Sequence, residues 1–173
     1  MNNELDLVTD WLLCASSQVG TDYFQLPEAT KDADVNEERK YRERVYCYEL
    51  YHRWRCHWPH GFRFSLTGEV DKNGHPLIRK KPKPDFLVHI PGQMTNLLIV
   101  EVKRKDAEVS EIVKDLEKLT VFQHDYGYHA AYFWIYGLEA SEWPQKHDKI
   151  NNEICNNKNI DCVRFSICRQ SGK

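Results

Sequence analysis

The sequence predicts an α/β fold in which a mixed central sheet is flanked by helices. The first observation is a change of hydrophobic period, from a helical spacing before residue 56 to alternation of apolar and polar residues over 62–67. The second is a pair of almost wholly apolar runs, 97–100 and 130–136, which are typical of strands covered on both faces of a sheet.

The N-terminal part of the chain is expected to be mainly helical. Residues 3–18 carry an apolar stripe at helical spacing, and residues 19–32 are expected to form a loop. A second, longer helix is predicted from an N-cap at Asp34 to about Arg55, where a turn containing Pro59 stops it.

After that helix, strands and helices follow one another to the end of the chain. A turn signal at residues 71–74 predicts a hairpin. We assign residues 1–34 to an N-terminal helix and loop, and residues 35–173 to one domain. The elements expected after the second helix are a strand at 62–67, its return from Pro76, strands at 85–90 and 97–103, a helix after Arg104, a strand at 130–136, a helix at 142–156 and a strand at 162–168.

The composition is that of an ordinary globular protein. With 41% hydrophobic and 29% charged residues, the chain belongs to neither the disordered nor the membrane class. No apolar run reaches the roughly 18 to 20 residues that cross a bilayer. The start, Met1–Asp6, is acidic and lacks the basic segment of a signal peptide. We therefore expect a cytoplasmic protein.

The cysteines predict no metal ribbon and no disulfide framework, because no two of them form a C-x-x-C pair. Reduced thiols, mostly buried, are expected. The run Cys56–His60 offers three possible zinc ligands, but no second ligand cluster stands at finger-like spacing, and a closed zinc site needs four ligands. The six cysteines are Cys14, Cys47, Cys56, Cys155, Cys162 and Cys168.

Charge is distributed unevenly although the net charge is only −2. Residues 39–105 hold 15 Lys and Arg against 6 Asp and Glu, whereas the remainder holds 9 against 20. A basic middle between acidic ends fits a phosphate-binding face on a nearly neutral protein. The same pattern also fits an ordinary solvated surface.

Three residues in this basic region predict a catalytic centre. Glu101 and Lys103 are two residues apart on a predicted strand, so they share a face, while Val100 and Val102 pack on the other side. Asp85 begins the preceding strand. If the two strands pair through the turn between them, Asp85 lies beside Glu101 and near the lysine.

This combination of residues suits phosphodiester hydrolysis. Two carboxylates in contact repel one another unless a cation lies between them, and oxygen ligands favour Mg²⁺ or Mn²⁺. Such an ion lowers the pKa of a bound water and stabilises charge on the phosphate. Lys103 is placed to orient or deprotonate that water, or to neutralise the developing negative charge.

The motif Pro84-Asp85, followed after a gap by Glu101-Val102-Lys103, resembles the signature of the PD-(D/E)XK, or restriction-endonuclease-like, nuclease superfamily. The order of elements over residues 35–137 is similar to the core of that superfamily, a helix, three strands, a helix and a strand. The resemblance implies a nuclease dependent on Mg²⁺ or Mn²⁺ that acts on nucleic acid, DNA rather than RNA being the first expectation.

The resemblance also implies further site residues. Many members add an acid from the first core helix, for which Glu49 is the first candidate and Glu43 the alternative. Glu69, on the predicted hairpin, is a third acid to consider, and Gln123 stands where some relatives carry a glutamine after the second core helix. His89 shares a strand face with Asp85, but a hydrogen-bonded core histidine is the preferred interpretation.

Substrate phosphates are expected along the basic residues that lead into and out of the motif. No helix-turn-helix, zinc finger or other base-reading module is recognisable, so sequence specificity is not predicted. The candidate nucleic-acid-binding residues are Arg79, Lys80, Lys81, Lys83, Arg104 and Lys105.

Other functions fit the same fold. A catalytically silent module that binds nucleic acid or protein is the main alternative, because a fold does not determine a function. The acidic ends also fit a docking surface, in a homodimer or in a larger complex. A zinc hydrolase is disfavoured because the sequence has no H-x-x-x-H pair.

Overall fold

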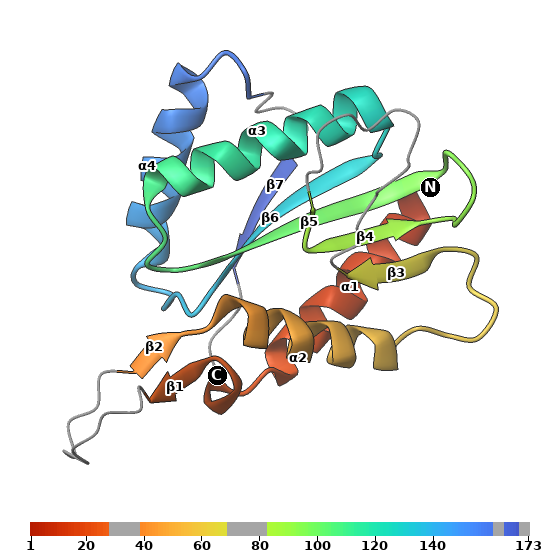
Figure 1. Ribbon diagram of the computed structural model, residues 1–173, viewed down its shortest axis with the longest axis horizontal. Coiled ribbons are helices and arrows are strands. Elements are labelled where there is room, and N and C mark those ends of the chain that lie inside the picture. The colour runs from red at the N-terminus through yellow and green to blue at the C-terminus, as the bar shows by residue number, and fades with distance from the viewer. Residues whose placement is uncertain (28–38, 69–82, 161–164, 170–173) are drawn as a thin grey trace.

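The computed structural model describes residues 1–27, 39–68, 83–160 and 165–169. A central sheet lies between two layers of helices, with α1 and α2 on one face and α3 and α4 on the other (Figure 1). The predicted class, a mixed α/β sheet flanked by helices, is confirmed. No helix in the described ranges is both long and apolar enough to cross a membrane.

The four α-helices form where the apolar spacing predicts them, with one shifted boundary, but a short 3₁₀ helix and strand β1 (Gln25–Pro27) occupy part of residues 19–32, where a loop was expected. The second helix begins at Glu43 and not near Asp34, because Arg39–Tyr41 instead pair as β2 with β1. Asp34 itself lies outside the described residues. The helices are α1 (Asn2–Gln18), the short 3₁₀ helix η1 (Thr21–Tyr23), α2 (Glu43–Cys56), α3 (Val109–Tyr126) and α4 (Trp143–Asn156).

The main sheet has the order β3-β4-β5-β6-β7. The first two pairings, β3 with β4 and β4 with β5, are antiparallel, and the pairings of β5 with β6 and β6 with β7 are parallel. The long strand β5 therefore lies in the middle, where antiparallel and parallel pairing meet. The strands are β3 (Ser65–Gly68), β4 (Phe86–His89), β5 (Asn96–Arg104), β6 (Ala130–Tyr136) and β7 (Phe165–Arg169).

Two cores form, because alternate residues of the central strands point to opposite faces. Val100 and Val102 are buried beneath α1 and α2, whereas Ile99 is buried beneath α3 and α4. One face of helix α1 packs into the first core: Val8 is completely buried, and its carbonyl accepts a hydrogen bond of 3.3 Å from Trp54 Nε1.

A buried aromatic contact joins α2 to β6. The Trp134 Nε1–H donates a hydrogen bond of 2.9 Å to the Tyr46 hydroxyl, and the Tyr46 ring stacks on Tyr136 with 4.0 Å between ring centroids. Both partners of the hydrogen bond are almost wholly buried. This contact holds the first turn of α2 against the carboxyl end of β6, and so places that turn beside the site described below.

Replacing Tyr46 by Phe is expected to lower the free energy of unfolding by about 1–3 kcal/mol, because the indole N–H then stays buried without an acceptor. Urea unfolding measures the change. Tyr48→Phe on the same helix is the matched control, since Tyr48 is 60% exposed and should lose almost nothing. Equal stability of the two variants would contradict the role given to the hydrogen bond.

Candidate active site

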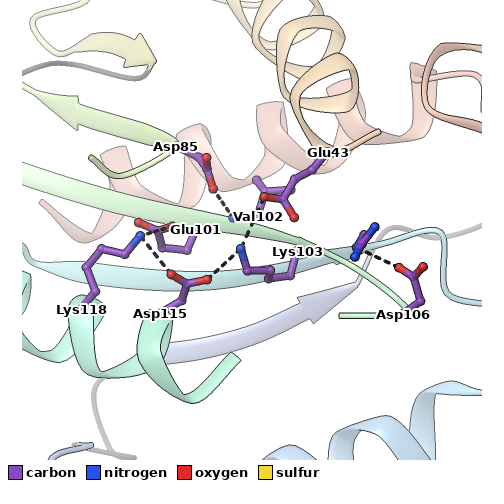
Figure 2. A network of polar contacts seen from close by, with 9 residues as sticks. Glu43, Asp85, Glu101, Val102, Lys103, Asp106, Asp115 and Lys118 are labelled. Carbon is purple, nitrogen blue, oxygen red and sulfur yellow. Dashed lines mark hydrogen bonds and ion pairs between the residues drawn. The ribbon is translucent and has the colours of Figure 1, made fainter. Parts of the chain in front are cut away.

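The pairing of β4 with β5 brings the two predicted acids together. Phe86 lies opposite Val100, so Asp85, immediately before β4, comes opposite Glu101. The Asp85 Oδ2 accepts a hydrogen bond of 2.7 Å from the backbone N–H of Val102, which fixes the carboxylate on β5 (Figure 2). The expected neighbourhood of Asp85 and Glu101 is therefore present.

Glu101 and Lys103 both point toward α3, as their two-residue spacing predicts (Figure 2). Lys118 Nζ lies 2.8 Å from Glu101 Oε2, and Lys103 Nζ lies 3.0 Å from Asp115 Oδ2. Val102, between the two, is buried in the other core with α1 and α2. The alternation of β5 thus separates charged residues from apolar ones.

Helix α3 contributes two charged residues that the sequence analysis missed. Asp115 bridges the lysines, because its Oδ1 lies 3.0 Å from Lys118 Nζ and its Oδ2 faces Lys103. The available signal was a charged pair placed three apart on a helix face that also carries buried Ile112 and Leu116. We name the group formed by Glu43, Asp85, Glu101, Lys103, Asp115 and Lys118 the acid–lysine cluster.

Of the two candidate acids on the first core helix, the structure places Glu43 in the cluster. The Glu43 Oε1 lies 3.4 Å from Lys103 Nζ. Glu49 instead forms an ion pair of 2.6 Å with Arg53, one turn further along α2. Six residues of helix separate the two glutamates by about 9 Å along the axis and turn them to different directions, so both cannot face β5. Glu43, the alternative candidate, is therefore the acid of α2 that lies beside Lys103, and Glu49 is not.

Burial disfavours the ionised form of both strand acids and so raises their pKa values. Burial, together with the nearby carboxylate of Glu43, raises the pKa of Asp85 to about 6, against the hydrogen bond from Val102. Glu101 is only 2% exposed, and burial followed by repulsion from Asp85 raises its pKa well above the ordinary value.

The two lysines are held in the charged form. Burial opposes the charge of each, but Asp115 and Glu43 raise the pKa of Lys103 above its usual value. Glu101 and Asp115 do the same for Lys118. Lys103 is therefore an ammonium group at neutral pH, which favours stabilisation of negative charge over removal of a proton from water.

The donor set suits a hard divalent cation in part. Asp85 and Glu101 offer carboxylate oxygens, and the buried Glu101 Oε1 has no hydrogen-bond partner among the residues that the structure describes. Among the described residues, however, no three His, Cys, Asp or Glu side chains form a ready metal-ligand group. The two acids fit an ion that keeps several waters, which is the habit of Mg²⁺.

The remaining residues that the sequence analysis proposed for the site are not members of the acid–lysine cluster. Gln123 is buried in α3, eight residues beyond Asp115. His89 Nε2 lies 3.4 Å from Thr67 Oγ1, which agrees with the preferred interpretation of a hydrogen-bonded histidine. Lys83 is exposed just before the site. Glu69, Arg79, Lys80 and Lys81 lie outside the described residues.

The thiols only partly match the expectation. Cys47 is a buried free cysteine, but Cys14, Cys56 and Cys155 are exposed free cysteines. The expectation that most cysteines are buried is therefore wrong for the described part of the chain.

The raised pKa of Asp85 gives a pH-dependent stability with a definite sign. Below about pH 3.8 the carboxyl is protonated in both folded and unfolded chains, so it adds no penalty. Stability is then lost as the pH rises from about 3.8 through about 6, because the unfolded chain releases this proton while the folded chain still holds it, and above about 6 the loss is complete.

Asp85→Asn removes this ionisation and keeps an oxygen acceptor for Val102. In chelator-treated protein the variant is expected to be more stable than wild type by about 1–3 kcal/mol at pH 8 and equal to it near pH 3.5. Denaturant unfolding at both pH values measures the difference, with the exposed Asp10→Asn as control. A difference that is the same at both pH values would contradict the assignment.

Comparison of the chain with known protein families, with curated proteins and with solved structures finds no match. The functional conclusion therefore has to come from the chemistry of the acid–lysine cluster.

Proposed function

We propose that the protein is a metal-dependent nuclease that hydrolyses phosphodiester bonds of nucleic acid, with DNA as the first substrate class. The observation that carries the proposal is the junction of Asp85, Glu101 and Lys103 on two paired strands. Two neighbouring carboxylates, Glu101 buried and Asp85 half-buried, are costly to ionise together unless a cation lies beside them, so their presence favours a functional site.

The order of elements supports the proposed relationship to restriction-endonuclease-like enzymes. From α2 onward the chain runs helix, three strands, helix and strand, as α2, β3, β4, β5, α3 and β6. Asp85 directly precedes β4, Glu101 lies in the middle of β5 and Lys103 lies near its end, an arrangement that supports the proposed relationship. The proposed core thus begins at α2, and α1 packs on it.

Each residue has a role that follows from its surroundings. Asp85 and Glu101 would hold Mg²⁺ or Mn²⁺, which supplies an activated water and neutralises phosphate charge when bound. Lys103, kept protonated by Asp115 and Glu43, stabilises the negative charge that builds on the scissile phosphate. Asp115 and Glu43 act through Lys103 by fixing the position of its ammonium group.

One observation favours the alternative of a silent binding module. Lys118 already neutralises Glu101, and Asp115 links it to Lys103, so the cluster is electrostatically satisfied by its own side chains. In a silent module these pairs are permanent. In a nuclease, the metal must replace Lys118 as the partner of Glu101. Whether Lys118 moves away from Glu101 when metal is added can be tested by experiment.

Metal binding and catalysis should separate in two variants. Glu101→Gln is expected to abolish Mn²⁺ binding and cleavage together, because a metal ligand is lost. Lys103→Ala is expected to keep Mn²⁺ binding and to lower the cleavage rate by roughly 10²–10³-fold, because only the charge beside the phosphate is lost. Calorimetric titration with Mn²⁺ and turnover of single- and double-stranded DNA and RNA measure the two effects.

The structure supplies matched controls. Glu49→Gln alters an acid on α2 that pairs with Arg53, and Lys114→Ala removes an exposed lysine of α3. Both should bind metal and cleave as wild type does. Mn²⁺ binding by wild type with no cleavage of any substrate would favour the silent module, and cleavage that survives in both Glu101→Gln and Lys103→Ala would exclude this site.

A further inference from the structure

A basic pocket opens beside the acid–lysine cluster, between the first turn of α2 and the carboxyl end of β5. Its volume is about 400 Å³. Glu43 and Lys103 belong both to the pocket wall and to the cluster, so the two sites are adjacent. The pocket is lined by Tyr41, Arg42, Glu43, Arg44, Val45, Lys103, Arg104 and Glu111.

The charges of the wall favour an anion. Four lining residues are cationic and two are anionic. Lys103 is already engaged by Glu43 and Asp115, so the guanidinium groups of Arg42 and Arg104 are the ones that we expect to bind an anion. Guanidinium groups suit phosphate especially well, because they can donate two parallel hydrogen bonds to its oxygens.

Arg104 is poised to make such a contact. It follows Lys103 on β5, and its side chain is 42% exposed. Its present partner, Asp106, lies 3.2 Å away and its side chain is 52% exposed. An ion pair in so much water contributes little stability, so a phosphate can replace it at small cost.

The size and the aromatic wall favour a nucleotide over a small inorganic anion. A volume of about 400 Å³ falls in the range of pockets that hold small organic ligands. Tyr41 is half-buried and packs against Tyr136, with 6.0 Å between ring centroids. Arginines beside an aromatic ring are the usual wall of a site for single-stranded nucleic acid.

We propose that this pocket is a second phosphate subsite, which binds a nucleotide of the substrate strand next to the one that is cut. The inference rests on the proposed nuclease function and deepens it. The strand would pass from Asp85 and Glu101, over Lys103, into the pocket. Arg42 and Arg104 contact the neighbouring phosphate, and this subsite sets the direction in which the strand lies across β5.

The test measures binding without chemistry. A fluorescein-labelled decathymidylate is titrated with full-length protein in the presence of a chelator, and fluorescence anisotropy gives Kd at several salt concentrations. The double variant Arg42→Gln/Arg104→Gln is expected to weaken binding roughly tenfold at about 0.1 M salt. The slope of log K against log salt should fall by about 1.4, because each phosphate contact on a single strand contributes about 0.7.

The control variant removes one arginine charge at a position outside the pocket. Arg55→Gln changes an exposed arginine in the last turn of α2 and should leave Kd and the salt slope nearly unchanged. The single variant Arg104→Gln alters a solvent-exposed side chain and should show about half of the slope change, even if the double variant does not fold. Unchanged binding in the Arg104 and double variants, or an equal loss in Arg55→Gln, would overturn the subsite.

The outcome for the subsite is distinguishable from the outcome for the nuclease. Binding that depends on Arg42 and Arg104, with no cleavage by wild type in Mg²⁺ or Mn²⁺, retains the subsite and rejects the nuclease. Cleavage by wild type that the double variant reproduces, with the same KM, rejects the subsite and retains the nuclease.

Discussion

A carboxylate removed from water is the constraint around which this molecule is arranged. Glu101 lies in the middle of the central strand and is only 2% exposed, so its charge needs a cation close by. Lys118 supplies one at 2.8 Å from α3, and Asp115 ties that lysine to Lys103. The position of α3 against β5 is therefore fixed by charge as well as by apolar packing.

The second acid makes this arrangement hard to explain by stability alone. Asp85 is brought opposite Glu101 by the pairing of β4 with β5, and its carboxylate makes Glu101 more costly to ionise. Apolar residues of similar size would pack there at lower cost. A buried acid whose pKa is raised by burial and by a second acid, beside a protonated lysine, instead suits a site for a divalent cation and a phosphate.

Much of the fold could be predicted from the sequence, because it depends on local periodicity. The alternation that separates Val102 from Glu101 and Lys103 is visible in five consecutive residues, and it placed the motif on one face correctly. The predicted start of α2 was wrong, because Arg39–Tyr41 pair with β1, and no local pattern in the sequence reveals that pairing.

The site could be predicted only where its residues share a strand or a hairpin. Choosing between Glu43 and Glu49 required the angle at which α2 crosses β5, which depends on packing contacts such as Tyr46 on Tyr136. Asp115 and Lys118 were missed for the same reason, since their partners lie on another element.

The most direct test of the central claim is anomalous diffraction from crystals soaked in Mn²⁺. If the acid–lysine cluster is a metal site, a peak appears at roughly 2.0–2.2 Å from carboxylate oxygens of Asp85 and Glu101, and Lys118 has moved away from Glu101. A cluster in which Lys118 still contacts Glu101, with no manganese at these two acids, would contradict the account.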